Sequence, residues 1–216
     1  MKIVVFGAGG GVGSRAVAAA AAAGHDVVAV ARSTDTLLAA SATGVAVVGA
    51  DVRDAAAVQR VLVGAQAVLW CVGVSKRSGP DVGRSSMPHV VSAAQEQGVA
   101  RLVSVSGAGV TLPGDAKGAG ARFVSALTRR FARDLVEDKE GEHEVLAGST
   151  LAWTEIRPPR LTDAPGTGSW LLTDTAPGLR AAGLSRADVA AAMLSLAGSS
   201  EYVHRSPFIV AGPPSS

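Results

Sequence analysis

The chain has 216 residues, a length typical of one domain with at most a small elaboration. Hydrophobic residues make up 48% of the chain and charged residues only 18%, which excludes an intrinsically disordered protein. The formal net charge of +2 is too small to indicate a nucleic-acid partner. A single cysteine, Cys71, excludes an intrachain disulfide and favours a reducing compartment.

The N-terminal residues give no sign of a targeting or membrane segment. Met1 and Lys2 run directly into an apolar stretch, without a cationic leader or a cleavage site. The alanine-rich run at 16–23 is far shorter than the ~20 residues that a membrane span needs. We therefore expect a soluble cytoplasmic protein with no membrane partner.

Six short valine-rich runs, mostly without polar alternation, predict strands that helices cover on both faces. They are Lys2–Phe6, Asp26–Val30, Val45–Val48, Ala67–Cys71, Arg101–Ser106 and Ala152–Ile156. The segments between them predict helices over Gly11–Ala23, Thr34–Ala40, Asp54–Val63, Arg84–Gln97 and Arg122–Ala147. Repeated βαβ units predict an α/β fold, a Rossmann-like doubly wound parallel sheet with helices on both faces.

The pattern changes after residue 159, where a loop-rich stretch over 160–184 contains one short strand at Ser169–Thr173. Ser185 then predicts the N-cap of a last helix that ends near Leu196, and a final short strand follows at Phe208–Val210. No internal repeat or linker divides the chain, so we expect one domain over 1–216 with a small C-terminal cap.

The first strand ends in a glycine-rich turn that opens a helix, with Gly7, Gly10 and Gly13 spaced as GxxGxxG. In a dinucleotide-binding turn, one glycine allows the tight turn, one lets the backbone approach the pyrophosphate, and one lets helix pack on strand. The helix start, including Gly11 and Val12, then presents its N–H groups to the phosphates. The alternative is a flexible glycine-rich turn without a ligand.

The tip of the second strand favours NADP(H) over NAD(H). NAD enzymes usually place an acidic residue about 20 residues after the glycine motif to bind the ribose 2′-hydroxyl. This chain has Arg32, Ser33 and Thr34 there, which offer a guanidinium and two hydroxyls to a 2′-phosphate. The alternative for Arg32 is an ordinary solvated loop residue.

The third and fourth strands supply further candidate cofactor residues at their ends. We expect Asp51 and Val52 to flank the adenine, and Cys71, Val72 and Gly73 to lie under the adenosine ribose. Cys71 is interpreted as a packed thiol rather than a reactive one. The nucleotide-binding part is therefore expected over about 1–158, and the substrate-side part over about 159–216.

These motifs, together with Ser106 after the fifth strand, Trp153–Pro159 and Leu184–Ala190, resemble the atypical short-chain dehydrogenases/reductases. The branch most similar is the NAD(P)H-binding proteins related to biliverdin reductase B, a flavin reductase. The resemblance covers nearly the whole chain and permits a monomer or a homodimer. Its cofactor motifs are specific, whereas its substrate features are not.

The resemblance implies a Tyr-xxx-Lys catalytic pair on the helix after the fifth strand. Lys139 matches the lysine, but Leu135 stands where the tyrosine is expected. The only tyrosine of the chain, Tyr202, lies near the C-terminus outside the motif, and the chain contains no Asn for the usual tetrad. The family's usual proton donor is thus missing from its place.

Three side chains are candidates for the catalytic positions. Ser106 either hydrogen-bonds the substrate or the nicotinamide end, or it caps nearby backbone. Lys139 either holds the nicotinamide ribose or is a solvated helix residue. His143, one turn further along, is a possible proton donor or a surface histidine. Pro158 and Pro159 are expected to fix the chain beside the nicotinamide through backbone contacts.

The leading function is an NADPH-dependent oxidoreductase that passes hydride to a conjugated small molecule such as a flavin, a quinone or a tetrapyrrole. Such acceptors take up protons from water and need no tyrosine. One alternative is a non-catalytic NADP(H)-binding redox sensor, and another is a biosynthetic epimerase, dehydratase or cyclase. The segments 74–83 and 110–120 are expected to form the rim of the site. The four histidines lack metal-ligand spacing, so no metal is expected.

Overall fold

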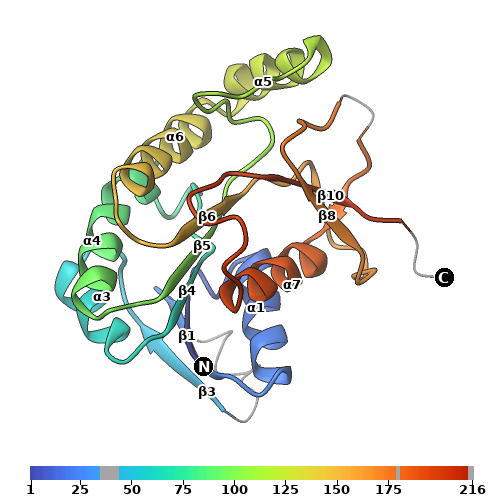
Figure 1. Ribbon diagram of the computed structural model, residues 1–216. Helices are drawn as coiled ribbons and strands as arrows, with labels where there is room; N and C mark the ends of the chain where they lie inside the picture. The colour runs from blue at the N-terminus through green and yellow to red at the C-terminus, as the bar shows by residue number, and fades with distance from the viewer. Residues whose placement is uncertain (35–43, 179–180, 214–216) are drawn as a thin grey trace.

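A six-stranded parallel sheet forms the centre of the molecule, as the computed structural model shows (Figure 1). The structure describes residues 1–34, 44–178 and 181–213. The strand order across the sheet is β3-β2-β1-β4-β5-β6, so the direction of winding reverses next to β1. The strands span Lys2–Phe6 (β1), Asp26–Ala31 (β2), Val45–Gly49 (β3), Ala67–Trp70 (β4), Arg101–Val105 (β5) and Trp153–Ile156 (β6). The predicted doubly wound α/β fold is confirmed.

Helices cover both faces of the sheet, which explains why the strand sequences do not alternate. Ile3 and Val5 of β1 enter the core cluster beneath one helical layer, and Val4 and Phe6 enter the cluster beneath the other. All four side chains are fully buried. Burial of an aliphatic side chain stabilises the fold by about 1.5–3 kcal/mol, so β1 is a central source of stability.

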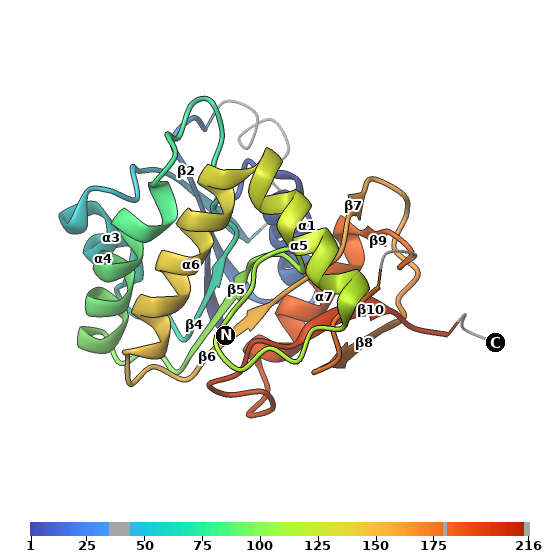
Figure 2. The ribbon, with the colours of Figure 1, turned by 90° about the horizontal axis from the view of Figure 1, so that it is seen from above.

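One layer consists of α1 (Gly11–Ala22) and α7 (Arg186–Ala197), which lie side by side in both views (Figures 1 and 2). The other layer consists of α3 (Ala55–Leu62), α4 (Val82–Glu96) and α6 (Arg133–Ala147). A further helix, α5 (Ala119–Phe131), lies beyond the end of α6 and buries only Ala121 and Ser125. Among the described residues, no helix is both long and apolar enough to cross a bilayer.

Two predicted helix starts are confirmed by their capping hydrogen bonds. The Asp54 carboxylate accepts the N–H groups of Ala56 and Ala57 at 3.0 and 3.1 Å. The Ser185 hydroxyl accepts the N–H of Asp188 at 2.9 Å. Such caps satisfy N–H groups that have no carbonyl partner within the helix. The predicted helix over Thr34–Ala40 lies almost wholly outside the described residues.

The prediction of one helix over Arg122–Ala147 is wrong. The chain leaves helical geometry at Ala132, where φ is −135° and ψ is 48°, and α5 and α6 meet there. The break contains no glycine or proline, so the sequence does not mark it. The two helices pack differently, since α6 lies along α4 and buries Val136 and Leu146, while α5 remains peripheral.

The C-terminal part adds two small sheets beside the main one. Strand β7 (Leu161–Thr162) pairs with β9 (Leu184–Ser185), and β8 (Trp170–Thr173) pairs with β10 (Phe208–Ala211). The segment before β10 runs along edge strand β6, with bridges at Thr154 and Arg157. Arg101 fastens this segment, because its guanidinium donates to the carbonyls of Ser199 and Glu201 at 2.9 and 2.7 Å.

Candidate functional site

The turn between β1 and α1 has the geometry that the GxxGxxG spacing predicts. Gly7 has a φ of +75°, and a Cβ there would lie 2.6 Å from the Cys71 carbonyl oxygen. A Cβ on Gly13 would lie 2.2 Å from the Gly7 carbonyl oxygen, so only glycine lets α1 approach β1 this closely. Gly10 N–H donates to Gly7 at 2.9 Å and closes the turn. Gly11, Val12 and Gly13 form the first turn of α1. The N–H groups of a first helical turn have no carbonyl partner within the helix and point out of its N-terminal end.

A cleft of about 550 Å³ opens above this turn, at the carboxyl ends of β1 to β4. This is the edge where open α/β sheets bind ligands. The cleft is lined by eight of the residues predicted from the sequence: Gly7, Gly10, Arg32, Ser33, Val52, Cys71, Val72 and Gly73. Asp51 instead accepts the N–H of Arg53 at 2.9 Å, and Thr34 lies against Gly49. Neither Asp51 nor Thr34 lines the cleft.

The β4–α4 connection folds over the cleft and is held there by two arginines. Arg32 Nη1 donates to the carbonyl oxygen of Arg77. Arg53 donates to the Ser78 carbonyl and pairs with Asp81, both at 2.7 Å. Arg77 itself lines the cleft together with Ser75 and Ser78. The sequence analysis placed this segment at the rim but missed Arg77, although the basic pair at 76–77 in a Gly/Ser-rich loop is a usable signal.

Cys71 lies in a packed environment that favours the unreactive thiol. Its Sγ lies 3.8 Å from the Met193 Sδ. Burial raises the pKa of the Cys71 thiol from 9.0 to about 12, while the charge of Lys139 opposes the shift. The thiolate is the nucleophilic form, so Cys71 belongs to the floor of the cleft and not to its chemistry.

A buried polar cluster on α6 links the second helical layer to the cleft. Asp138 is fully buried and accepts the N–H groups of Gly83 and Arg84 at 2.9 and 3.0 Å, so it caps the start of α4 from a neighbouring helix. Lys139 Nζ donates to the Val72 carbonyl at 2.8 Å and to both oxygens of Glu142 at 2.9 and 2.8 Å. Burial raises the pKa of Glu142 to about 7, against the opposing charge of Lys139. The sequence did not reveal that this charged stretch is buried.

This cluster changes how Lys139 is understood. An ammonium has three N–H donors, and the contacts with Val72 and Glu142 use all three. The interpretation of Lys139 as a solvated helix residue is wrong, since its side chain is 5% exposed. The predicted ribose contact remains a prediction, and it requires the ammonium to exchange one of these partners.

The ends of β5 and β6 bring Ser106 and Pro158 to neighbouring positions. Ser106 N–H donates to Ile156 at 2.9 Å, and Ala108 N–H donates to the Pro158 carbonyl at 2.8 Å. The Ser106 hydroxyl is buried and has no hydrogen-bond partner among the described residues. A buried hydroxyl without a partner is destabilising, and the structure shows no backbone group that this hydroxyl caps, so its contact with a ligand stays a prediction. Pro159 follows, half-buried.

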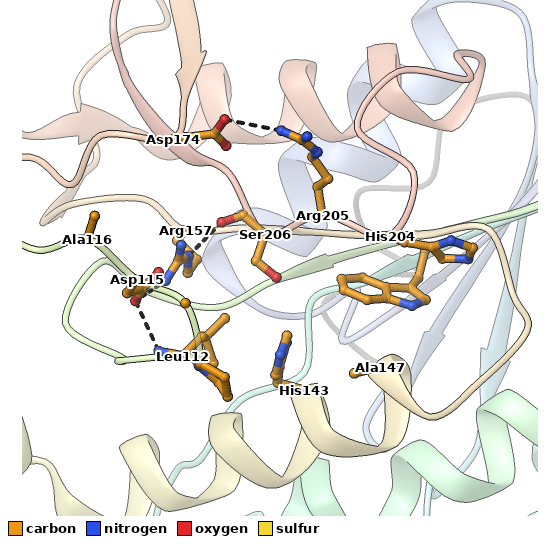
Figure 3. A pocket seen from close by; sticks show the side chains of 13 residues that line it. Leu112, Asp115, Ala116, His143, Ala147, Arg157, Asp174, His204, Arg205 and Ser206 are labelled. Carbon is orange, nitrogen blue, oxygen red and sulfur yellow. Dashed lines mark hydrogen bonds and ion pairs between the residues drawn. The ribbon is translucent and has the colours of Figure 1, made fainter.

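His143 does not join the residues of the dinucleotide cleft. Its Nδ1 lies 2.8 Å from the buried carboxylate of Glu155, and its ring lines a second cavity of about 600 Å³ (Figure 3). This second cavity shares no lining residue with the dinucleotide cleft. Lys139 and His143 are therefore one helical turn apart but contact different parts of the protein. His143 is only 15% exposed and bonded to a buried carboxylate, so its interpretation as a surface histidine is wrong.

Two arginines lie against the start of α1, Arg15 from α1 itself and Arg186 from the start of α7. Arg15 donates to the Gly11 carbonyl at 2.7 Å. The Arg186 side chain packs so closely on Gly11 that a Cβ there would lie 2.7 Å from its Cδ. Both arginines pair with Asp163 at 3.2 and 3.0 Å. Asp163 is largely exposed, so this pairing is weak and exchangeable.

The residue set of the cleft fits a dinucleotide better than a metal. Within the described ranges, no three His, Cys, Asp or Glu side chains come together as metal ligands. The cleft instead combines a glycine cradle, a helix N-terminus and basic side chains, which are groups that bind phosphate.

Comparison with known proteins agrees with this geometry. A family model described as NAD(P)H-binding matches residues 7–199. The chain is 25% identical to ChuY, an anaerobilin reductase from Escherichia coli O157:H7, over the full length of both chains, with a TM-score of 0.80. It is 20% identical to a short-chain dehydrogenase/reductase from Veillonella parvula solved with NADP, covering 99% of this chain and 94% of that one, with a TM-score of 0.78.

A curated relative is an uncharacterized protein of Mycobacterium tuberculosis, 35% identical over 106 residues. The match covers 49% of this chain but only 12% of that protein's length. The similarity at full length therefore comes from the family model and the solved structures. The chain belongs to the NAD(P)H-binding family.

Proposed function

We propose that this protein is an NADPH-dependent oxidoreductase that passes hydride to a conjugated small molecule such as a flavin, a quinone or a tetrapyrrole. The observation that carries the proposal is the basic rim of the cleft, where Arg32 and Arg77 meet above a glycine cradle. The described residues at the tip of β2, up to Thr34, include no acidic side chain of the kind that NAD-specific sites usually place there.

The residues present fit the dinucleotide at each of its ends. Gly7 and Gly13 leave the space that a Cβ would fill, and the start of α1 offers N–H groups to the pyrophosphate. Arg32 leaves the Arg77 carbonyl to form a charge-assisted fork with the 2′-phosphate, and Arg77 supports it from the opposite rim. Cys71 and Val72 form the floor, and Val52 lies against the base, with Asp51 next to it behind the wall of the cleft.

The nicotinamide end lies at the ends of β5 and β6. Ser106 donates its free hydroxyl to the carboxamide or to the acceptor, and Pro158 and Pro159 hold the chain rigid beside it. NADPH supplies the hydride when it is bound. Lys139 acts as a positioning residue, because its ammonium donates to the Val72 carbonyl and so fixes the floor of the cleft. The nucleotide-binding part then spans about 1–158, and residues from about 159 onward form the acceptor side.

The class of acceptor is inferred from the lack of a tyrosine that could donate a proton to the substrate. If Lys139 matches the family's lysine, Leu135 stands where the resemblance expects the tyrosine, and Tyr202 lies elsewhere with its hydroxyl 3.4 Å from the Leu172 carbonyl. An acceptor with extended conjugation stabilises the added electron pair itself and takes its protons from water. The similarity to an anaerobilin reductase supports an acceptor of this class.

The cofactor assignment is tested by dissociation constants of NADPH and NADH, measured from nicotinamide fluorescence. A charge-assisted hydrogen bond contributes about 1.5–3 kcal/mol, so Arg32→Ala should weaken NADPH by about 10–100-fold and leave NADH nearly unchanged. Arg60→Ala removes the same charge from α3 outside the cleft and serves as the matched control. Equal losses for both dinucleotides in Arg32→Ala would contradict a contact with the 2′-phosphate.

The reaction is tested by loss of the NADPH absorbance with FMN, a simple quinone and biliverdin offered in turn. The proposal expects turnover with at least one acceptor and slower turnover in Arg32→Ala at limiting NADPH. Tight NADPH binding without oxidation by any of the three would overturn the proposed reductase. A redox sensor or an enzyme without net reduction would then take its place.

A further inference from the structure

The second cavity lies along the edge of the sheet, away from the dinucleotide cleft. It is bounded by α6, by the loop over 112–116 and by the segment 204–206 that runs beside β6 (Figure 3). Its volume of about 600 Å³ falls in the range of small-molecule sites. The segment over 110–120, expected at the rim of the dinucleotide site, thus borders this cavity, and none of its lining residues lines the dinucleotide cleft.

A buried cluster with excess positive charge forms one end of this cavity. Arg157 Nη1 pairs with Asp115 at 2.7 Å, and Lys117 Nζ lies 3.7 Å from the same carboxylate. All three side chains are less than 10% exposed. Two cations thus share one carboxylate, and Arg157 and Lys117 also lie over the ring of Phe208 at 3.9 and 5.8 Å. A buried charge without a counter-ion is strongly unfavourable.

The titration of the cluster agrees with this excess charge. Burial lowers the pKa of Lys117, and the repulsion by Arg157 adds to burial while Asp115 opposes it. Burial raises the pKa of Asp115, but the hydrogen bonds from Arg157 and Leu112 and the two positive charges outweigh burial and hold that pKa below its usual value. Asp115 therefore remains ionised, and Arg157 and Lys117 both lie beside the same oxygen of its carboxylate, Oδ2.

Arg157 keeps one free edge toward the cavity. Its Nε donates to the Ser206 carbonyl at 2.8 Å and its Nη1 donates to Asp115. Its Nη2 makes no hydrogen bond to any part of the chain that the structure describes, and Arg157 is among the residues that line the cavity. The free edge of a guanidinium matches a carboxylate in geometry and charge.

Aromatic rings form the wall next to this cluster. Trp153 lies between two imidazoles, with ring centroids 5.7 Å from His143 and 5.9 Å from His204. His204 is held there with a φ of +57°, and its Nε2 lies 2.8 Å from the Leu151 carbonyl. A left-handed histidine is an unfavourable conformation that persists only where the surroundings fix it, and such strain is typical of binding sites.

Two other carboxylates lie near the cavity, Glu155 and Asp174, and neither forms an ion pair with Arg157 or Lys117. Glu155 lies beneath His143, bonded to its Nδ1 and to the Ser206 hydroxyl at 3.1 Å. Asp174 and Arg205 pair with each other at the rim and are both well exposed, so solvent screens them. The buried Asp115 cluster therefore determines which charge the cavity prefers.

We propose that this cavity is a second ligand site, independent of the dinucleotide cleft, for a flat aromatic carboxylate. The carboxylate binds the free edge of Arg157 and neutralises the buried cluster. The ring system lies along Trp153 and the two imidazoles. A cation would be repelled by the cluster, and a neutral molecule would leave its charge uncompensated.

The test uses 2-naphthoate as the probe and its neutral amide, 2-naphthamide, as the matched control. Binding is measured by calorimetry on the full chain saturated with NADPH. The proposal expects naphthoate to bind at least tenfold more tightly than the amide, a difference of about 1.4 kcal/mol. Equal binding of the two probes, or displacement of NADPH by naphthoate, would overturn it. Neither result depends on whether the protein reduces any acceptor.

Variants then locate the site. Arg157→Met should abolish the preference for naphthoate over the amide, and Arg60→Ala on α3, outside this cavity, should retain it. If Arg157→Met fails to fold, Lys117→Met removes one charge of the cluster without removing a residue that lines the cavity. The preference should then fall by tenfold or more while NADPH affinity is unchanged. A preference that survives in every folded variant would contradict the assignment.

Discussion

The contact between Gly13 and Gly7 gives the sharpest prediction about the fold of the cofactor turn. In Gly13→Ala the new Cβ would lie 2.2 Å from the Gly7 carbonyl oxygen and 2.8 Å from its carbon. An ordinary C···O contact is about 3.3 Å, so α1 must move away from β1 by about 1 Å. Both contacted atoms are backbone, so no flexible side chain can yield.

The expected result is a loss of about 1–3 kcal/mol in the free energy of unfolding, as for other overpacked sites. For a domain of this size that corresponds to a decrease in Tm of about 2–12 °C. Displacement of the α1 start also moves its N–H groups away from the pyrophosphate, so NADPH affinity should fall at least tenfold.

Gly9→Ala is the matched control, because a Cβ at Gly9 would meet only the Ala31 Cβ, at 3.8 Å. Its thermal unfolding without cofactor should stay within about 2 °C of the wild-type protein. Equal Tm values for Gly13→Ala and Gly9→Ala in calorimetry would refute the close approach of α1 to β1.

Three further predictions concern groups outside the glycine turn. Burial raises the pKa of Asp188, but the hydrogen bonds from Thr167, Ser185 and Gly168 outweigh burial and lower it, so its contribution is present above about pH 4 and is lost as the pH falls through the folded pKa. Asp188→Asn should therefore lower the urea midpoint at pH 7 more than at pH 3, and equal losses at both pH values would count against this linkage. Alkylation of Cys71 by iodoacetamide at pH 8 should be about a thousandfold slower in the folded than in the urea-unfolded protein, because its pKa of about 12 suppresses the thiolate; comparable rates would show an accessible thiolate. Arg101→Lys should destabilise the protein by about 2–4 kcal/mol in urea unfolding, because one ammonium cannot replace four hydrogen bonds of a planar fork; a loss no larger than that of Arg205→Lys at the exposed rim would argue against this role.

The sheet and the glycine turn could be predicted because their sequence signals are local. Valine-rich runs such as Lys2–Phe6 specify strands buried on both faces, and Asp54 and Ser185 mark helix starts that the structure confirms. Glycine spacing at 7, 10 and 13 reports a close backbone approach that no other residue allows. In each case the physical requirement falls within a few neighbouring residues.

The polar side of α6 could not be predicted, because its partners lie far away in the sequence. Asp138 is buried by the start of α4 and Lys139 by the Val72 carbonyl, and neither contact leaves a mark near residue 138. The break at Ala132 could not be predicted for a related reason. It contains no helix-breaking residue and accompanies the separate packing of α5 and α6.

The same difference between local and distant signals decides which residues of the candidate site could be predicted. Residues next to strand ends, such as Gly73 and Arg32, lie in the cleft because the parallel sheet brings those ends together. Arg77 reaches the cleft only through the folding of the β4–α4 connection. His143 was placed near Lys139 by helical spacing, but His143 lines the second cavity whereas Lys139 is buried against the Val72 carbonyl.

The central claim is hydride transfer from NADPH bound in the cleft to a conjugated acceptor. The most direct measurement compares oxidation of NADPH and of NADPH deuterated at nicotinamide C4, in single turnover with each of the three acceptors. The account predicts NADP⁺ formation equal to acceptor reduction, with a slower rate for the deuterated cofactor. NADPH that stays bound and unoxidised in the presence of every acceptor would contradict it.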